Sequence, residues 1–180
     1  MITAGLAQAE IKDTILLGGD SLGVGLCPEF KKLAKEEGYA GVCQSIGGTN
    51  TKQWSQWLPS KLSTYHPKLV ILSLGTNDSG AIAKAFLDHP ENIAKIVDAV
   101  NKAEAKLVWI GLPDLHKKKL PYRDQVLQLI TNNVENVYDS TGTLGQSQDQ
   151  IHFTGDGYKN WMNDIWSWIK EKQILEIKGD

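Results

Sequence analysis

The chain has 180 residues, of which 41% are hydrophobic and 22% charged, and its formal net charge is −2 at pH 7. This length suits one domain with its own core, and we therefore expect a single domain over residues 1–180. Because the net charge is small and negative, we expect the protein to bind no nucleic acid. No stretch approaches the ~20 consecutive apolar residues that span a bilayer, and residues 1–12 lack the basic start and apolar core of an export signal. These totals leave the cellular compartment and the oligomeric state open.

Apolar runs rich in Val, Ile and Leu alternate with helical patterns along the whole chain. The expected strands are, in chain order, TILLGGDS (14–21), YAGVCQSI (39–46), KLVILSLG (68–75), KLVWIGLP (106–113) and NVYDS (136–140). The expected helices are 28–38, with Pro28 early and Gly38 as its stop, then 53–65, 91–105, 121–132 and 156–175. The third and fourth strands are apolar without interruption, which is typical of a parallel sheet covered on both faces. The pattern therefore predicts a three-layer α/β/α sandwich around a mostly parallel five-stranded sheet.

The two cysteines, Cys27 and Cys43, are too few for a disulfide framework, and no histidines accompany them at the spacing of a zinc site. We expect two small thiols that fill the core, with a single disulfide as the alternative.

Polar residues follow the expected strands at the points where they end. In parallel sheets ligands bind beyond the carboxyl ends of the strands, so these residues should gather at one edge. They are Asp20 and Ser21, Gly47 and Gly48, Asn77 and Asp78, Asp114 and His116, and the segment 149–153.

The stretch GGDSLGVGL (18–26) can be compared with three known glycine motifs. A phosphate loop would need Lys and a hydroxyl residue where Val24 and Gly25 stand, and a dinucleotide fingerprint would need glycine where Pro28 stands. The nucleophile pattern G-x-S-x-G is satisfied around Ser21, but in α/β-hydrolases it normally follows several earlier strands, whereas here it follows the first. A serine nucleophile still requires a base and donors for an oxyanion, and the other strand ends offer both.

Four blocks in order carry a resemblance to the SGNH hydrolases, also called GDSL hydrolases. The blocks are GDSL with Ser21, SIGGTNT with Gly48, GTND with Asn77, and DQIH with Asp149 and His152. Together they cover the chain from about 14 to 155, each just past an expected strand. The second block is the loosest, because its glycine could be Gly47 or Gly48, and we choose Gly48.

The resemblance implies a flavodoxin-like SGNH fold and a serine esterase that needs no metal and no organic cofactor. Ser21 would be the nucleophile, His152 the base, and Asp149 the carboxylate that orients the imidazole. The backbone N–H groups of Ser21 and Gly48 and the side-chain amide of Asn77 would meet the oxyanion.

Each of these residues also has a structural interpretation. Ser21 could be a helix N-cap, and we interpret Asp20 and Asp78 as structural, the latter as a helix cap. His89 and His116 compete with His152 for the role of base, but neither has an acid partner at comparably tight spacing. His66 precedes the third strand, at the wrong edge of the sheet.

For the substrate, we expect an ester with a short acyl group such as acetate, carried on a small molecule or a glycan. The ground is that the loops after the third and fourth strands look too short to enclose a long chain. Pocket candidates are Trp54, Leu112 and His116; Trp54 and its neighbour Trp57 could equally pack in the core. Alternatives are a hydrolase acting on cell-wall peptidoglycan, a lysophospholipase or thioesterase, and a glycan-binding module without activity.

Overall fold

The computed structural model describes residues 13–80, 90–114, 120–143 and 149–175. Its centre is a five-stranded sheet in the order β2-β1-β3-β4-β5, in which every neighbouring pair is parallel. The strands are β1 (Thr14–Gly19), β2 (Ala40–Cys43), β3 (Leu69–Ser73), β4 (Lys106–Ile110) and β5 (Val137–Tyr138). This order is the flavodoxin-like one, so the expected sheet is confirmed.

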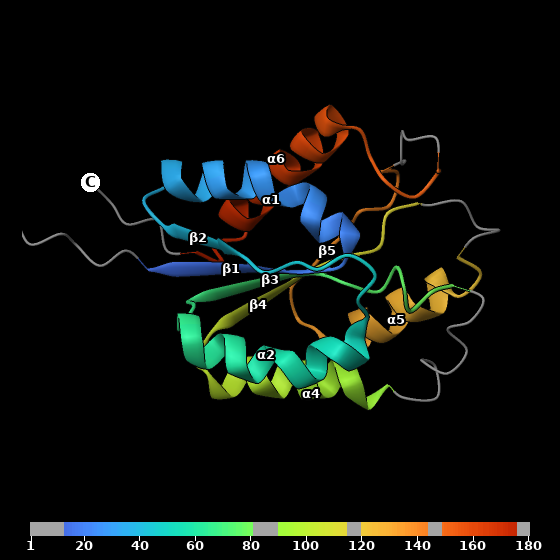
Figure 1. Ribbon diagram of the computed structural model, residues 1–180, viewed down its shortest axis with the longest axis horizontal. Coiled ribbons are helices and arrows are strands. Elements are labelled where there is room, and N and C mark those ends of the chain that lie inside the picture. The colour runs from blue at the N-terminus through green and yellow to red at the C-terminus, as the bar shows by residue number, and fades with distance from the viewer. Residues whose placement is uncertain (1–12, 81–89, 115–119, 144–148, 176–180) are drawn as a thin grey trace, which may run out of the picture.

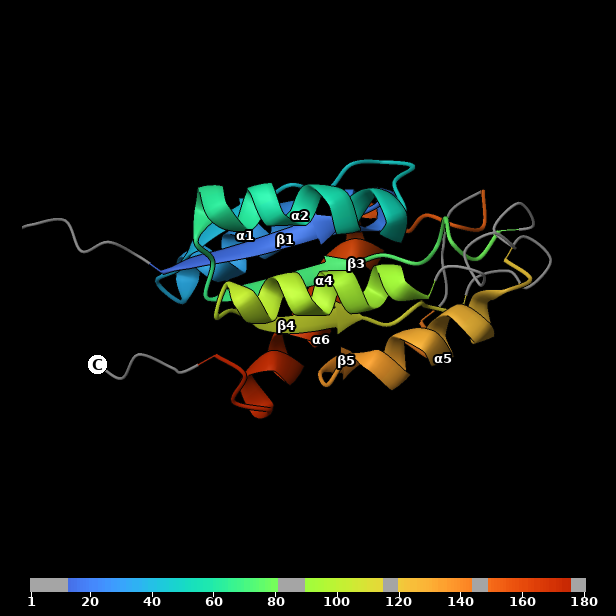
Figure 2. The same ribbon diagram turned by 90° about the horizontal axis from the view of Figure 1, so that it is seen from below.

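Helices cover both faces of this sheet (Figure 1). On one face lie α1 (Ser21–Glu36) and α6 (Gly155–Glu171); on the other lie α2 (Thr51–Tyr65), α4 (Glu91–Lys102) and α5 (Arg123–Asn133). Figure 2, which views the molecule from below, shows α2 and α4 side by side in front of the strands, in agreement with their contacts. The three-layer α/β/α sandwich is therefore confirmed. None of the helices within the described ranges is long and apolar enough to cross a bilayer.

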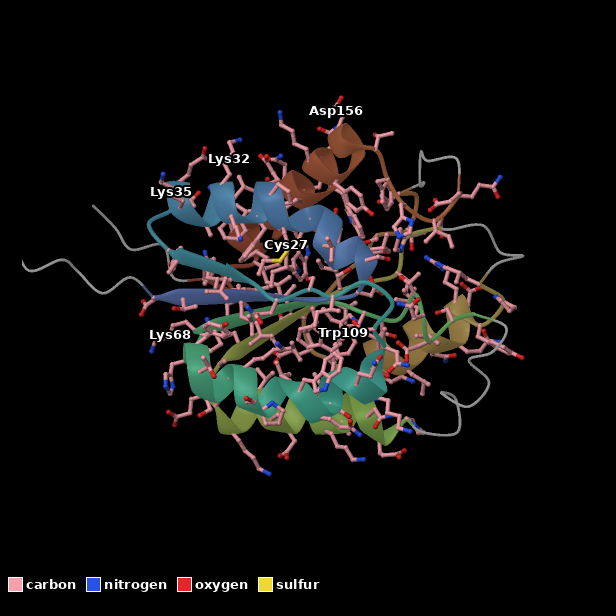
Figure 3. All side chains as sticks on the ribbon, in the orientation of Figure 1. Cys27, Lys32, Lys35, Lys68, Trp109 and Asp156 are labelled. Atoms are coloured by element: carbon pink, nitrogen blue, oxygen red, sulfur yellow. A yellow bond between two sulfur atoms is a disulfide. The ribbon has the colours of Figure 1, made fainter. Side chains whose placement is uncertain are left out.

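The uninterrupted apolar strands are explained by two separate cores. Ile15 and Leu17 pack with residues of α1 and α6, whereas Leu16 between them packs with residues of α2 and α4. Side chains alternate between the faces of a strand, so a strand covered on both sides buries every position. Trp109 of β4, labelled in Figure 3, belongs to the second core and donates its indole N–H to the carbonyl of Leu74 at 3.0 Å.

Helix α1 begins at Ser21, well before the Pro28 expected from the sequence. The glycines that disfavour a helix there are required by packing. A Cβ at Gly23 would lie 2.6 Å from Ser45 Oγ, and one at Gly25 would lie 2.2 Å from the ring of Tyr158 on α6. Tertiary contact therefore overrides the low helix propensity of the segment.

Cys27 of α1 and Cys43 at the end of β2 form a disulfide, seen as the sulfur pair beside the Cys27 label in Figure 3. The expectation of two free thiols is wrong. The reason is that α1 packs directly along β2, where a Cβ on Gly41 would lie 2.9 Å from the Cβ of Ala34. This close approach leaves the Cα atoms of the two cysteines 5.9 Å apart, within the usual range for a disulfide.

Candidate active site

The nucleophile candidate Ser21 is the first residue of α1, immediately beyond β1. Asp20 caps this helix, because its Oδ1 accepts the N–H of Leu22 at 2.9 Å, and its own N–H donates to the carbonyl of Ser73 at the end of β3. The structural role expected for Asp20 is thus present. At the first position of a helix the N–H of Ser21 has no intrahelical acceptor, so it is available to an anion.

Ser21, His152 and Asp149 form a continuous hydrogen-bonded series. The Oγ of Ser21 lies 2.8 Å from Nε2 of His152, although the two residues are far apart in the chain. On the other side of the ring, Nδ1 of His152 is hydrogen-bonded to Oδ2 of Asp149. The structure therefore brings together the three residues that the sequence predicts as nucleophile, base and acid.

One turn before α6 supplies both the imidazole and the carboxylate. Oδ1 of Asp149 accepts the backbone N–H groups of Ile151 at 3.0 Å and of His152 at 2.9 Å, so the carboxylate also fixes the turn that carries the base. Phe153 is buried against Tyr158 and Trp161 of α6. The side chains of Asp149 and His152 remain 50% and 40% exposed, so the series opens to solvent at this end.

The turn after β2 lies beside the nucleophile. The N–H of Ile46 donates to the carbonyl of Gly19 at 2.9 Å, and a Cβ at Gly47 would lie 3.9 Å from the Cβ of Ser21. Gly48 has φ +78°, a left-handed conformation that glycine adopts without strain. The turn is therefore placed so that its backbone can approach a group bound at Ser21.

Asn77 follows β3 and is exposed at the same edge of the sheet. Its Nδ2 donates to the carbonyl of Thr49 at 2.8 Å, which leaves the second N–H of the amide for another acceptor. Asn77 therefore lies beyond β3 at the same edge of the sheet as Ser21 beyond β1 and the glycine turn beyond β2.

A protein-family model described as the GDSL-like Lipase/Acylhydrolase family matches residues 17–159. The chain belongs to this family. It is therefore a hydrolase of ester bonds. No curated protein sequence matches the chain.

Solved structures with this fold include several other hydrolases. A lipase/acylhydrolase from Enterococcus faecalis has a TM-score of 0.69 at 16% identity, with 94% of this chain and 100% of that one covered. An acetyl xylan esterase has a TM-score of 0.73 at 15% identity, with 87% and 99% covered. A peptidoglycan O-acetylesterase has a TM-score of 0.62 at 18% identity, with 75% of this chain and 47% of that one covered. At these identities the likeness shows the shared fold.

Two buried carboxyl groups lie behind the site of this GDSL family member. Asp20 is fully buried, and its Oδ2 has no hydrogen-bond partner among the described residues. Burial raises the pKa of Asp20 to about 7, and the nearby carboxylate of Asp78 acts in the same direction. Burial also raises the pKa of Asp78 to about 6, against the opposing effect of hydrogen bonds from Thr51. Asp78 is not the N-cap of a described helix: Asn50 caps α2, and Asp78 accepts the N–H of Thr51 at the first position of that helix.

Two of the three pocket candidates are corrected by the structure. Trp54 is 0% exposed, since it faces the sheet beneath Gly18, where a Cβ would lie 2.4 Å from its ring. Leu112 is 2% exposed and packs against Gly75. Both therefore belong to the core and cannot line an open pocket. The third candidate, His116, and the competing base His89 lie outside the described residues.

Other side chains at this edge were not predicted. Val24, one turn after Ser21, and Ile46, just before the glycine turn, are each 45% exposed. Trp57 of α2, which the sequence analysis considered together with Trp54, is 36% exposed. Thr49 and Thr51 are buried and connect the loops after β2 and β3. The sequence signal for this segment is the N-x-x-Q capping box of Asn50 and Gln53. It starts α2 at Thr51, two residues before the start that the sequence analysis expected.

Proposed function

We propose that this hydrolase cleaves esters through a covalent acyl-enzyme on Ser21. The observation that carries the proposal is the 2.8 Å contact of Ser21 Oγ with His152 Nε2, with Asp149 on the opposite ring nitrogen. A serine hydroxyl is a weak nucleophile until an adjacent base accepts its proton, and here the base is in place.

In the first half-reaction Ser21 Oγ forms a bond to the ester carbonyl carbon while its proton passes to Nε2 of His152. The carbonyl electron pair moves onto the oxygen, which would accept the N–H groups of Ser21 and Gly48 and the free N–H of Asn77. When the tetrahedral intermediate collapses, the bond to the alcohol oxygen breaks and that oxygen takes the proton from His152. Asp149 holds the ring and stabilises the imidazolium between these two transfers.

In the second half-reaction water replaces the alcohol. His152 accepts a proton from the water as its oxygen bonds to the acyl carbon, and the same three donors receive the oxyanion. Collapse then breaks the bond to Ser21 Oγ, which recovers its proton from His152. The products are the carboxylic acid and free enzyme, so this scheme uses only the chain, its ester substrate and one water molecule.

For the substrate we propose a short acyl group, such as acetate, on a carbohydrate. The loops after the third and fourth strands, which the sequence predicts to be short, include residues 81–89 and 115–119, and these lie outside the described residues. The support is instead the exposure of Gly48, Asn77 and the side chains of Asp149 and His152, since an open site can admit a bulky alcohol. The fold shared with an acetyl xylan esterase agrees with this proposal.

Labelling with a fluorophosphonate tests the nucleophile. We expect one label, mapped by mass spectrometry to Ser21, and we expect His152→Ala to lose both the label and ester turnover. His66→Ala is the matched control, because His66 ends α2. A label on another serine, or full activity of His152→Ala with loss in His89→Ala or His116→Ala, would overturn the assignment.

A substrate panel tests the acyl preference. p-Nitrophenyl esters from acetate to decanoate, acetylated xylan and O-acetylated peptidoglycan are compared by kcat/KM. We expect acetate to be cleaved fastest among the p-nitrophenyl esters. A faster decanoate would favour a lipase or thioesterase, with Val24 and Ile46 as the apolar contact. No turnover of any ester, together with binding of the polysaccharides, would favour the glycan-binding module.

A further inference from the structure

The orientation of the Asn77 amide matters for the reaction proposed above. A carboxamide carries an oxygen on one side and two N–H groups on the other, and only the N–H side can stabilise an oxyanion. The carbonyl of Thr49 accepts one N–H of Asn77 at 2.8 Å, so it requires the nitrogen on its side. Any movement of Thr49 therefore displaces the second N–H, which is the donor that the oxyanion needs.

Thr49 is held in place by its own side chain. Its Oγ1 donates to the carbonyl of Ile46 at 2.8 Å and accepts the indole N–H of Trp54 at 3.0 Å. These contacts fix Thr49 to the turn after β2 and to α2. They do not by themselves fix that turn to Asn77, which follows a different strand.

Asp78 supplies the connection between the two loops. Its Oδ1 accepts the hydroxyl of Thr51 at 2.8 Å, and both carboxylate oxygens accept the N–H of Thr51 at 3.2 Å. Asp78 and Thr51 are both buried. Because Asp78 follows Asn77 and Thr51 lies two residues after Thr49, the two sets of contacts join segments 49–51 and 77–78 along their length.

We propose that Asp78 is a positioning residue of the oxyanion hole, which acts through Thr51 and Thr49 to hold the Asn77 amide with its free N–H toward the substrate. The inference rests on the proposed function, since it assigns Asp78 to the same site. Hydrogen bonds to an ionised carboxylate are about twice as strong as neutral ones. The carboxylate of Asp78 therefore holds Thr51 more firmly than an amide or a hydroxyl group at position 78 would.

A double-mutant cycle between Asp78→Asn and Asn77→Ala tests the proposal on a p-nitrophenyl ester. Asp78→Asn keeps the shape of the side chain and should lower kcat by roughly tenfold or more with KM little changed, as expected for a small displacement of a catalytic group. In the Asn77→Ala background the same change should lower kcat by less than about threefold, because the group it positions is already absent. A purely structural role would give the same loss in both backgrounds.

Substitutions of Thr51 test the same proposal with a smaller change to the buried side chains. Thr51→Val removes the hydroxyl that Asp78 accepts and should lower kcat in the same way, whereas Thr51→Ser retains the hydroxyl and should restore it. If Asp78→Asn does not fold, the cycle is run with Thr51→Val. Ser79→Ala is the matched control, because Ser79 is buried in the same loop but its hydroxyl donates to the carbonyl of Gly75 at 2.6 Å and not to Thr51 or Asn77.

The outcomes separate the two proposals. Loss of kcat that depends on Asn77, in variants whose melting temperatures still exceed the assay temperature, supports the positioning role. Additive losses, or unchanged kcat in Asp78→Asn and Thr51→Val, would overturn it while leaving the esterase proposal intact. A wild-type protein that cleaves no ester would instead overturn the proposed function.

Discussion

Asn77 has a carboxamide at a position where a simple turn would accept an aspartate equally well. If its N–H stabilises the oxyanion, the bond strengthens as charge develops, so its loss should appear in kcat and not in KM. We expect Asn77→Ala to lower kcat by roughly 10²- to 10³-fold, the range for removing one such donor. Asn77→Asp should be at least as damaging, because it places a carboxylate against the developing charge.

Steady-state kinetics and melting temperatures of the two Asn77 variants provide the check. Near-normal turnover of Asn77→Asp would remove Asn77 from the oxyanion hole. Loss of activity that follows unfolding would do the same.

Asp20 makes the stability of the protein depend on pH. Its pKa rises from an ordinary 3.8 to about 7 on burial, so between these values the folded protein keeps a proton that the unfolded chain releases. The free energy of unfolding should therefore fall as pH increases from 5 to 8. Asp78, whose pKa is raised to about 6, contributes in the same direction at the lower end of this range.

The variant Asp20→Asn isolates the Asp20 contribution. Asparagine keeps an Oδ1 that can accept the N–H of Leu22, and it carries no charge at any pH. Melting temperatures measured at pH 5 to 8 should decline less steeply in this variant than in the wild type, above all between pH 5 and 7, and the two slopes should converge near pH 8. Equal slopes in the two proteins would show that Asp20 is already ionised in the folded state.

At the level of the helix, the two tryptophans of α2 occupy opposite environments. Trp54 is fully buried against the sheet, while Trp57 is among the three large apolar side chains exposed within the described ranges. Trp54→Ala should lower the free energy of unfolding by about 3–5 kcal/mol, because it leaves a cavity in the core. Trp57→Ala should change it by no more than about 0.5 kcal/mol. Urea unfolding of both variants measures the difference, and similar losses would contradict the assignment of faces.

The strands were the most predictable elements of this fold. Continuous apolar runs such as 69–73 identify strands covered on both faces, and the ends of these strands identify the edge that carries the site. The starts of α1 and α2 were missed for a physical reason. Gly23 and Gly25 are tolerated in α1 only because Ser45 and Tyr158 pack against them, and this contact cannot be seen in the local sequence.

The motif residues and the pocket residues differ in how they could be predicted. Ser21 and His152 were predicted through four blocks in a fixed order, and the structure places them 2.8 Å apart. Trp54 was proposed only because it follows a glycine turn. A position after a turn does not indicate which face of the following helix packs against the sheet. Proximity in sequence therefore gave a wrong prediction for Trp54, whereas the four blocks identified Ser21 and His152, which are in contact.

For the molecule as a whole, the Cys27–Cys43 disulfide connects the helix of the nucleophile to the strand that leads into the glycine turn. The two cysteines are separated by 16 residues, and closing a loop of this size should stabilise the fold by about 3 kcal/mol. The double variant Cys27→Ala/Cys43→Ala should lose stability by this amount. Its kcat should remain near the wild-type value below its melting temperature, because neither sulfur is part of the catalytic series.

Chemical denaturation with and without a thiol reductant measures this contribution. Reductant should lower the stability of the wild type and leave the double variant unchanged. Equal sensitivity of the two proteins would show that the cysteines are not bonded in solution.

The chemical groups of the proposed site differ in how firmly the fold holds them. Ser21 and Asn77 follow the buried central strands β1 and β3, whereas the acid and the base share one solvent-facing turn. Opening that turn should require far less free energy than unfolding the sheet, because local opening involves the least buried parts of a protein. Heat should therefore inactivate this enzyme at temperatures where circular dichroism still reports a folded sheet, and cooling should restore activity without a refolding step. Activity that disappears only together with the sheet would show that the turn is as firmly held as the strands.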